Sequence, residues 1–342
     1  MGKLKIAVLG AGYWASLQIP SWQAAGAEVV AIWNRTREKA ALLAERFGIK
    51  HVYDTAEELF EHADFDLADV ITNPESHKRL VLTAASYKKP VVCQKPMATS
   101  LEDSREMSRA CREAGIWFAI HENFRYREAW RRVGEIIRGG GLGRVIRAEI
   151  TLCSASADGL RLEPALAKLG HMALLDMGPH VFDLTRLLFG EALSVYCRDF
   201  ASRPENGVLD TAIALLDMRG GACVKCEICN DKGPSAFVSA ENGVLAYDAE
   251  HYITVNVNGY LHRYEPPAFV RPEFIPEASW QNHGGDGMLS IRRCNEGIME
   301  SFLGGRPAAT DGEYSLKTAE LVFKAIGSAE TNAVSFIEGA RQ

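Results

Sequence analysis

The stretch of sequence that decides the fold is LKIAVLGAGYWA, residues 4–15. It begins as an apolar run of strand length, and Gly10 and Gly12 then lead into a segment with helical spacing. The pattern G-x-G-x-x-A between a strand and a helix is typical of the turn that binds a dinucleotide pyrophosphate. Gly10 permits the tight turn, Gly12 lets the backbone approach the phosphates, and Ala15 keeps helix and strand close. We therefore expect a dinucleotide-binding domain here.

The alternation of strand and helix continues through residue 120. Thr55 with Glu58, and Ser100 with Asp103, mark two helix starts, because a Ser or Thr side chain caps the amides that follow it. Near-continuous apolar strands between helices predict a parallel sheet covered on both faces, the doubly wound arrangement of a Rossmann domain. The expected strands are 4–9, 29–33, 51–53, 68–72, 91–93 and 116–120, and the expected helices are 14–24, 37–47, 76–87, 100–114 and one that begins near 55.

The regular alternation of strands and helices ends after residue 123. Strand-like segments dominate, and a helical stretch over 172–189 interrupts them, which predicts an α+β domain with a mostly antiparallel, open sheet. We divide the chain into an NAD(P)-binding Rossmann domain, 1–123, and a substrate-binding and oligomerisation domain, 124–342. The second is expected to hold helices at 129–137, 290–303 and 314–331, and strands at 145–152, 193–198, 211–218, 222–229, 236–239 and 253–257.

Composition excludes several classes of function. The chain has 342 residues, 47% of them hydrophobic and 24% charged, and a formal net charge of −6. This balance argues against a nucleic-acid-binding surface and against a polybasic membrane anchor. No apolar run approaches the roughly 18 to 20 residues of a membrane-spanning helix. Because Met1-Gly2-Lys3 leads directly into the first strand, we expect no signal peptide and a cytoplasmic protein.

The eight cysteines lie mostly in apolar runs and are expected to be small buried hydrophobes in a reducing compartment. Cys223, Cys226 and Cys229 form C-x2-C-x2-C, which resembles part of an iron–sulfur site. The segment also has the pattern of a strand, however, and a period of two puts Cys226 on the face opposite the other two. No fourth cysteine lies nearby, so we expect no metal site.

The end of the second strand bears on the choice of nucleotide. A carboxylate there would bind the ribose 2′-hydroxyl of NAD, but the sequence has Asn34, followed by Arg35 and Thr36. These three residues suit a 2′-phosphate, which a carboxylate would repel. The sequence favours NADP over NAD, although Arg35 can also be read as a solvated residue at a helix start.

Five further motifs extend along nearly the whole chain. With the glycine turn, they resemble the Gfo/Idh/MocA family, the glucose–fructose oxidoreductase and inositol dehydrogenase-like enzymes. The resemblance lies in their order and spacing, since no single motif is decisive. They are V-V-C-Q-K-P at 91–96, Thr72-Asn73-Pro74 with His77, Asn123 with Arg125, L-D-M-G-P-H-V-F-D at 175–183, and G-R-P at 305–307 with T-D-G at 310–312.

This resemblance implies a set of cofactor-binding positions. In the family, the segment after the fourth strand lies beside the nicotinamide half of the cofactor, and Glu-Lys-Pro follows the fifth strand. Here Gln94 replaces the glutamate, which removes a carboxylate that would stabilise a charged lysine. The positions implied to bind cofactor are Gly10, Gly12, Tyr13, Trp14, Asn34, Arg35, Thr36, Thr72, Asn73, Pro74, His77, Gln94 and Lys95.

Lys95 is the expected catalytic base. Oxidising a secondary alcohol requires a hydride acceptor and a base that takes the hydroxyl proton. Lys95 follows a buried strand at the edge of the sheet where ligands of such sheets bind, and Pro96 fixes the backbone after it. An ordinary lysine has a pKa of about 10.4, and burial beside an oxidised nicotinamide would lower it. The alternative is a surface lysine that snorkels to solvent.

Asp176 and His180 are spaced i, i+4 and are expected to share one helix face. A histidine transfers protons readily near neutral pH, and the family match favours His180 and Asp176 as catalytic and substrate-binding groups over a purely structural pair. Asn123 is a further substrate-binding candidate, and Asp183 is expected to support the helix. Weaker candidates are His121 and Glu122 at the domain junction, Asp158 and Lys168 in a loop that could wall the substrate, and His171, whose role is open.

We therefore expect an NAD(P)-dependent oxidoreductase that acts on the CH-OH group of a sugar, sugar acid or polyol. An aldose such as apiose, an inositol or an anhydro-sugar is implied by the resemblance, as is a homodimer or homotetramer. One alternative is a reductase of non-sugar carbonyls, similar to dihydrodiol dehydrogenase. The other is a non-catalytic protein that senses NADP, which the joint presence of Lys95, Asp176 and His180 disfavours.

Overall fold

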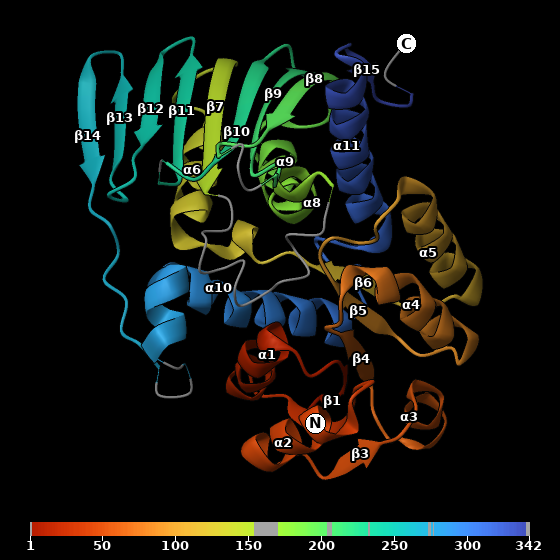
Figure 1. The fold of residues 1–342 in the computed structure, drawn as a ribbon. Helices are drawn as coiled ribbons and strands as arrows, with labels where there is room; N and C mark the ends of the chain where they lie inside the picture. The colour runs from red at the N-terminus through yellow and green to blue at the C-terminus, as the bar shows by residue number, and fades with distance from the viewer. Residues whose placement is uncertain are drawn as a thin grey trace. The chain divides into compact units, whose positions relative to one another are not determined.

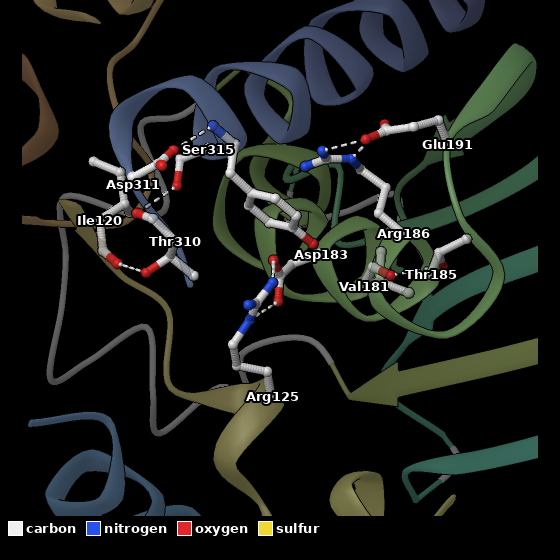
Figure 2. Close-up of polar contacts among 11 residues, drawn as sticks. Ile120, Arg125, Val181, Asp183, Thr185, Arg186, Glu191, Thr310, Asp311 and Ser315 are labelled. Atoms are coloured by element: carbon white, nitrogen blue, oxygen red, sulfur yellow. Dashed lines mark hydrogen bonds and ion pairs between the residues drawn. The ribbon is translucent and has the colours of Figure 1, made fainter. Parts of the chain in front are cut away.

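The computed structural model describes residues 2–153, 170–203, 207–231, 233–272, 275 and 277–339. The chain forms two compact units. Unit 1 contains Met1–Asn123 and Phe269–Ala319, and unit 2 contains Phe124–Ala268 and Glu320–Gln342. The segment Phe269–Ala319, which the sequence pattern assigned to the second domain, therefore returns to the first. One reason is a pair of bonds at Ile120, whose N–H donates to the Thr310 carbonyl (2.8 Å) and whose carbonyl accepts from the Thr310 hydroxyl (2.6 Å; Figure 2).

Unit 1 is built on a six-stranded, fully parallel sheet, as the sequence predicts (Figure 1). The strand order is β3-β2-β1-β4-β5-β6, so β1 and β4 are neighbours and the chain turns to opposite sides of that pair. This point in a doubly wound sheet is where a ligand binds, outside the carboxyl ends of the strands. The strands are β1 Lys5–Leu9, β2 Glu28–Trp33, β3 His51–Tyr53, β4 Leu67–Val70, β5 Val91–Gln94 and β6 Phe118–His121.

Helices pack on both faces of this sheet. One face contributes Ala7, Val70 and Cys93 to an apolar cluster with side chains of α3, α4 and α5. On the other side, α1 lies beside α10, as Figure 1 also shows, and Leu17 packs on Met288. The helices of unit 1 are α1 Tyr13–Ala24, α2 Arg37–Phe47, α3 Ala56–His62, η1 Pro74–Ser76, α4 His77–Ser86, α5 Leu101–Ala114 and α10 Glu277–Leu303.

The predicted helix caps are confirmed. The Thr55 hydroxyl accepts from the Glu58 N–H at 3.0 Å, and the Ser100 hydroxyl accepts from the Asp103 N–H at 3.1 Å. The helix α10 begins earlier than expected, at Glu277 and not at Ser290. The stretch before Ser290 contains Gly284, Gly285 and Gly287, which are weak helix formers, and Met288 and Ile291 pack with Leu17 of α1.

Unit 2 is built on a nine-stranded sheet in the order β14-β13-β12-β11-β7-β10-β9-β8-β15. Only β7 and β10 pair in parallel within the described sheet, so it is mostly antiparallel, as expected. The sequence reading missed β12, β14 and β15. The strands are β7 Val145–Cys153, β8 Ala192–Phe200, β9 Thr211–Met218, β10 Cys223–Cys229, β11 Ser235–Ala240, β12 Gly243–Tyr247, β13 Ile253–Val257, β14 Tyr260–Tyr264 and β15 Ser335–Phe336.

Helices cover one face of this sheet (Figure 1). This face carries the main core of unit 2, where Ile150 and Leu216 pack with Trp130 and Phe182 from helices. The helical elements are η2 Phe124–Tyr126, α6 Glu128–Arg138, α8 Met172–Asp176, α9 Gly178–Phe189 and α11 Gly312–Thr331, which belongs to unit 2 from Glu320 onward. Among all described residues, no helix is both long and apolar enough to cross a membrane.

The helical stretch expected over 172–189 is confirmed, but it is divided into two helices. The chain forms α8 and α9, which meet at Met177. Pro179 lacks the N–H that would bond the Leu175 carbonyl, and its ring crowds that carbonyl, so the helix cannot continue unbroken. Asp176 is therefore the last residue of α8, and His180 lies in the first turn of α9.

Candidate active site

The glycine turn has the geometry that a dinucleotide needs. Gly10 has φ +128°, and a Cβ atom there would lie 2.2 Å from the Ile71 carbonyl oxygen, so only glycine fits between β1 and the residue after β4. Gly12 precedes α1, and no side chain caps that helix. Around Gly12 the space within 4 Å of an added Cβ is empty. The N-terminus of α1, where the helix dipole places a partial positive charge, can therefore attract an anion.

Asn34 links this turn to the end of β2. Its Oδ1 accepts from the Ala11 N–H at 3.1 Å, and its Nδ2 donates to the Thr36 carbonyl at 2.9 Å. Arg35 is exposed and makes no ion pair with any described residue, whereas Arg37 pairs with Asp54. The end of β2 thus presents one uncommitted guanidinium and no carboxylate.

Of the cofactor candidates after β4, His77 is placed differently from Thr72, Asn73 and Pro74. Those three lie in the partly exposed turn at the strand end, whereas His77 is fully buried. Its Nδ1 lies 2.9 Å from the Pro96 carbonyl and its Nε2 lies 3.0 Å from the Thr72 carbonyl. Burial holds the pKa of His77 below its usual value. His77 therefore joins the turns after β4 and β5.

Lys95 follows the last residue of β5 at the carboxyl edge of the parallel sheet. It is half-buried, its peptide bond to Pro96 is cis, and its backbone N–H donates to Gln94 Oε1 at 3.2 Å. Since all six strands of unit 1 run in one direction, Gly10, Thr72 and Lys95 follow strand ends at the same edge. Unit 1 thus brings a glycine turn and a lysine to the one edge of the sheet where ligands of this fold bind.

A buried polar network, which sequence reasoning missed, lies directly behind Lys95. Asp69 Oδ2 accepts from Gln18 Nε2 at 2.7 Å and from Trp22 Nε1 at 2.6 Å. Gln94 Nε2 donates to Gln18 Oε1 at 2.5 Å and lies 3.2 Å from His121 Nδ1. The signal in the sequence was a single carboxylate inside the apolar strand Leu67–Val70.

Asp69 is an unusual carboxylate because no part of it reaches solvent. Burial raises its pKa to about 7, although hydrogen bonds from Trp22 and Gln18 act in the opposite direction. Its second oxygen, Oδ1, has no hydrogen-bond partner among the described residues. A buried carboxyl loses the hydration that stabilises it in water, and hydrogen bonds to only one of its oxygens compensate for part of that cost.

The remaining cofactor candidates, Tyr13 and Trp14, lie at the start of α1. Their rings meet edge to face, with the ring centroids 6.1 Å apart. Both pack against the apolar cluster that α1 shares with α10. Asn123 is buried, and its Nδ2 donates to Ser290 Oγ at 2.7 Å. Its amide is thus already engaged within unit 1.

In unit 2, the imidazole of His180 is buried and stacks on Phe124, with ring centroids 3.8 Å apart and an interplanar angle of 16°. The guanidinium of Arg127 lies over the Phe124 ring at 3.6 Å from its centroid. This stacking fixes the plane of the imidazole at the start of α9. Asp176 is also buried, at the end of α8.

Asp183 supports its helix, as the sequence predicted. Arg125 Nε donates to Asp183 Oδ2 at 2.9 Å and Nη2 donates to Oδ1 at 2.6 Å, and both side chains are almost fully buried (Figure 2). A bidentate, buried pair of this kind holds η2 against α9. It thereby fixes Phe124, on which His180 stacks.

His171 and the cysteines of β10 contact other side chains of unit 2. His171 Nδ1 lies 2.6 Å from Asp199 Oδ2, and its Nε2 lies 3.3 Å from Glu330 Oε1. Cys226 is buried beside the Thr185 hydroxyl, Cys229 is also buried, and Cys223 is exposed, and all three lie on the strand β10 that the sequence predicted. Asp158 and Lys168 lie outside the described residues.

Two sequence profiles match the chain. One is described as an oxidoreductase family with an NAD-binding Rossmann fold and matches residues 4–121, and the other is the GFO/IDH/MocA C-terminal domain and matches residues 130–245. Together they cover the sheet of unit 1 and most of the sheet of unit 2. The two matches occur in the order in which the sequence analysis placed its two domains.

Named relatives extend these matches. A D-apiose dehydrogenase of Rhizobium rhizogenes is 34% identical over 65% of the chain and 64% of that protein's own length. A D-apiose dehydrogenase of Paraburkholderia graminis is 29% identical over 94% of the chain and 86% of that protein. Among solved structures, an oxidoreductase from Agrobacterium radiobacter in complex with NAD+, L-tartaric acid and magnesium superposes with a TM-score of 0.91, at 26% identity over 98% of each chain.

Proposed function

This chain belongs to the Gfo/Idh/MocA family of NAD-binding oxidoreductases, and from that premise we propose that it oxidises or reduces one CH-OH carbon of a sugar, sugar acid or polyol. The observation that carries the proposal is the position of Lys95. It follows β5 at the same sheet edge as the open glycine turn of β1. A base and a dinucleotide site at one edge are what an alcohol dehydrogenase requires.

The residues of unit 1 fit a dinucleotide. Gly10 allows the backbone of the turn to pass the Ile71 carbonyl, and Gly12 leaves open space where a side chain would stand. The positive end of the α1 dipole, at Gly12, would hold the pyrophosphate. When bound, NAD(P) supplies the hydride acceptor or donor for the reaction.

Lys95 would take the hydroxyl proton in the oxidative direction and return it in the reductive one. Gln94 holds the Lys95 backbone through its amide oxygen (3.2 Å), and it adds no negative charge beside the lysine. We propose that His180 and Asp176 complete the proton path and bind substrate hydroxyls. Asn123 is a weaker substrate ligand in this scheme, because its Nδ2 already donates to Ser290.

We propose NADP as the preferred nucleotide. Arg35 makes no ion pair with a described residue, and Asn34 replaces the carboxylate that would repel a 2′-phosphate. Fluorescence titration of the reduced nucleotides is expected to give tighter binding of NADPH than of NADH, with the preference reduced or reversed in Arg35→Glu. Arg37→Glu is the matched control, because Arg37 is already paired with Asp54. Equal preference in the wild type and Arg35→Glu would contradict this assignment.

A polyhydroxylated substrate is favoured by the relatives. Two are named D-apiose dehydrogenases, and the solved structure with a TM-score of 0.91 holds L-tartaric acid, which carries neighbouring hydroxyls. We therefore propose aldoses, with D-apiose first, then sugar acids and inositols. A screen of these compounds with both oxidised nucleotides, followed at the absorbance of the reduced nicotinamide, tests the substrate class. Cofactor binding with no turnover of any sugar, polyol or other carbonyl compound would favour the non-catalytic sensor.

Lys95→Ala tests the catalytic assignment. Loss of the base is expected to lower turnover by about 10²- to 10⁴-fold while leaving cofactor affinity nearly unchanged. The exposed Lys50 provides the matched control, because Lys50→Ala removes the same charge in unit 1 away from the carboxyl edge. Wild-type turnover in Lys95→Ala would refute the role of Lys95.

We also propose a homodimer or homotetramer that forms through the face of the unit 2 sheet opposite its helices. Ile213 and Leu215 of β9 are exposed on that face, and Val244 of β12 is exposed with them, because these residues alternate with core residues such as Ala214, Leu216 and Leu245. Ile213 and Leu215 are neighbours on β9, and Val244 lies four strands away in the order of the sheet. Exposed apolar side chains on the outward face of a sheet are typical of a protein interface.

A further inference from the structure

The network around Asp69 crosses three adjacent strands of the unit 1 sheet. Asp69 belongs to β4, Gln94 to β5 and His121 to β6, and all three lie on the sheet face opposite the apolar cluster that contains Val70, Cys93 and Ile120. The side chains that join or extend this row come from helices. They are Gln18 and Trp22 of α1 and Asn295 of α10, whose Oδ1 lies 2.9 Å from His121 Nε2.

The direction of every hydrogen bond in this row follows from groups that can act in one way only. The Trp22 indole N–H can only donate, so Asp69 Oδ2 accepts from it. At the other end, the Lys95 backbone N–H can only donate, so the oxygen of the Gln94 amide faces it. Gln94 Nε2 must then donate toward Gln18 and His121. Gln18 accepts from Gln94 with its oxygen and gives its Nε2 protons to Asp69.

This direction determines the tautomer of His121. Since Gln94 Nε2 donates, His121 Nδ1 has to accept and its proton sits on Nε2. That proton is then donated to Asn295 Oδ1. Protonation of Asp69 leaves the order unchanged, because the proton would occupy Oδ1, which has no partner among the described residues, while Oδ2 continues to accept.

We infer that Asp69 is a positioning residue for the proposed reaction: through Gln18 it fixes the orientation of the Gln94 amide, and thereby the backbone of Lys95 and the tautomer of His121. Asp69 touches neither Lys95 nor the carboxyl edge, so it acts only through Gln18 and Gln94. A carboxylate at position 94 could not take this place, because it has no N–H to give to Gln18 or to His121. Asp69 and Gln94 therefore belong to one connected hydrogen-bond network.

The first test measures the tautomer of His121 and does not depend on any enzyme activity. Full-length protein labelled with 15N-histidine is examined by two-bond 1H–15N correlation, and His121→Gln identifies the His121 signals. The wild type is expected to show the neutral form protonated on Nε2. In Asp69→Leu and Gln18→Leu, which each break the row, the His121 signals are expected to broaden or to shift toward a mixture of tautomers.

Asp69→Asn is the rescue variant. Its side-chain oxygen can still accept from Trp22 and Gln18, while its NH2 group falls where Oδ1 already lacks a partner. His121 in Asp69→Asn is expected to keep the wild-type tautomer. An exposed control, Asp64→Asn, removes a carboxyl just before β4 without touching the row. Unchanged His121 signals in both leucine variants, or equal loss in Asp69→Asn and Asp69→Leu, would overturn the inference.

The second test rests on the proposed function and measures turnover. Asp69→Leu and Gln18→Leu are expected to lower kcat about 10- to 100-fold with little change in cofactor affinity, and Asp69→Asn to restore most of the loss. Wild-type kcat in both leucine variants would overturn the link to Lys95. If the wild type turns over no substrate, the proposed function fails, while the His121 measurement still decides whether Asp69 orders the row.

Discussion

At the scale of single residues, the most informative side chain is a carboxyl with no access to solvent. Asp69 interrupts an otherwise apolar strand, and the fold compensates with two strong donors, the Trp22 indole and the Gln18 amide. Burial of a carboxyl at this position lowers the folding stability by several kcal/mol relative to an apolar residue of similar size. The presence of Asp69 therefore indicates that it orients the side chains bonded to it, and not that it stabilises the fold.

Asp69→Asn should change how stability depends on pH. Burial raises the pKa of Asp69 to about 7 in the folded chain, whereas the unfolded value is about 3.9. Between these values the folded chain binds more protons than the unfolded chain, so the free energy of unfolding falls as pH rises. The wild type should lose up to about 4 kcal/mol relative to Asp69→Asn across this window, and stay level above it. Urea unfolding at several pH values measures the difference, and parallel curves for the two proteins would contradict it.

At the scale of elements, the turns after the parallel strands carry the candidate chemistry, and their shapes are set by contacts with one another. Gly10 passes so close to the Ile71 carbonyl that no side chain fits, and His77 joins the turns after β4 and β5 through the Thr72 and Pro96 carbonyls. The turns after β1, β4 and β5 therefore contact one another at the carboxyl edge of the sheet. In unit 2, the break between α8 and α9 at Met177 places Asp176 and His180 on separate helices.

Gly12→Ala tests whether the glycine turn binds the dinucleotide, because this change should affect cofactor affinity and not stability. An added Cβ meets no atom within 4 Å and the backbone φ of −85° suits alanine, so thermal stability should change little. The methyl group would occupy the space proposed for the pyrophosphate, and the Kd for NADPH should rise at least about tenfold. Gly26→Ala is the matched control, because its φ of +98° strains alanine in open space at the far end of α1. That variant should lose stability and keep affinity, and normal affinity in Gly12→Ala would exclude this turn as the pyrophosphate site.

At the scale of the whole molecule, the chain forms two compact units, and unit 1 is completed by residues from late in the sequence. The helix α10 packs on α1 and supplies Asn295 to the row behind Lys95. The first unit would therefore not be complete if the chain were cut after Asn123. Its sheet would lose the cover that Leu17 shares with Met288 and Ile291.

Leu215→Glu tests the proposed assembly. Leu215 is exposed on the outward face of the unit 2 sheet, and a charge there should weaken association between copies while leaving the core of that unit intact. Sedimentation velocity of the wild type should give a dimer or tetramer, and the variant should shift to smaller species. Leu42→Glu, at an exposed position on α2, is the control. A monomeric wild type, or an unchanged Leu215→Glu, would contradict the proposal.

The sequence by itself determined the features that repeat along the chain. Short apolar runs between helical patterns predicted all six strands of unit 1. Capping side chains predicted the starts of α3 and α5, and the glycine turn predicted the ligand edge, because each is set by neighbouring residues. Tertiary structure alone decided the rest. The bond from Asn123 to Ser290 and the row from Asp69 to Asn295 join residues far apart in the chain. No local pattern records such contacts, since they depend on which helix covers which face of the sheet.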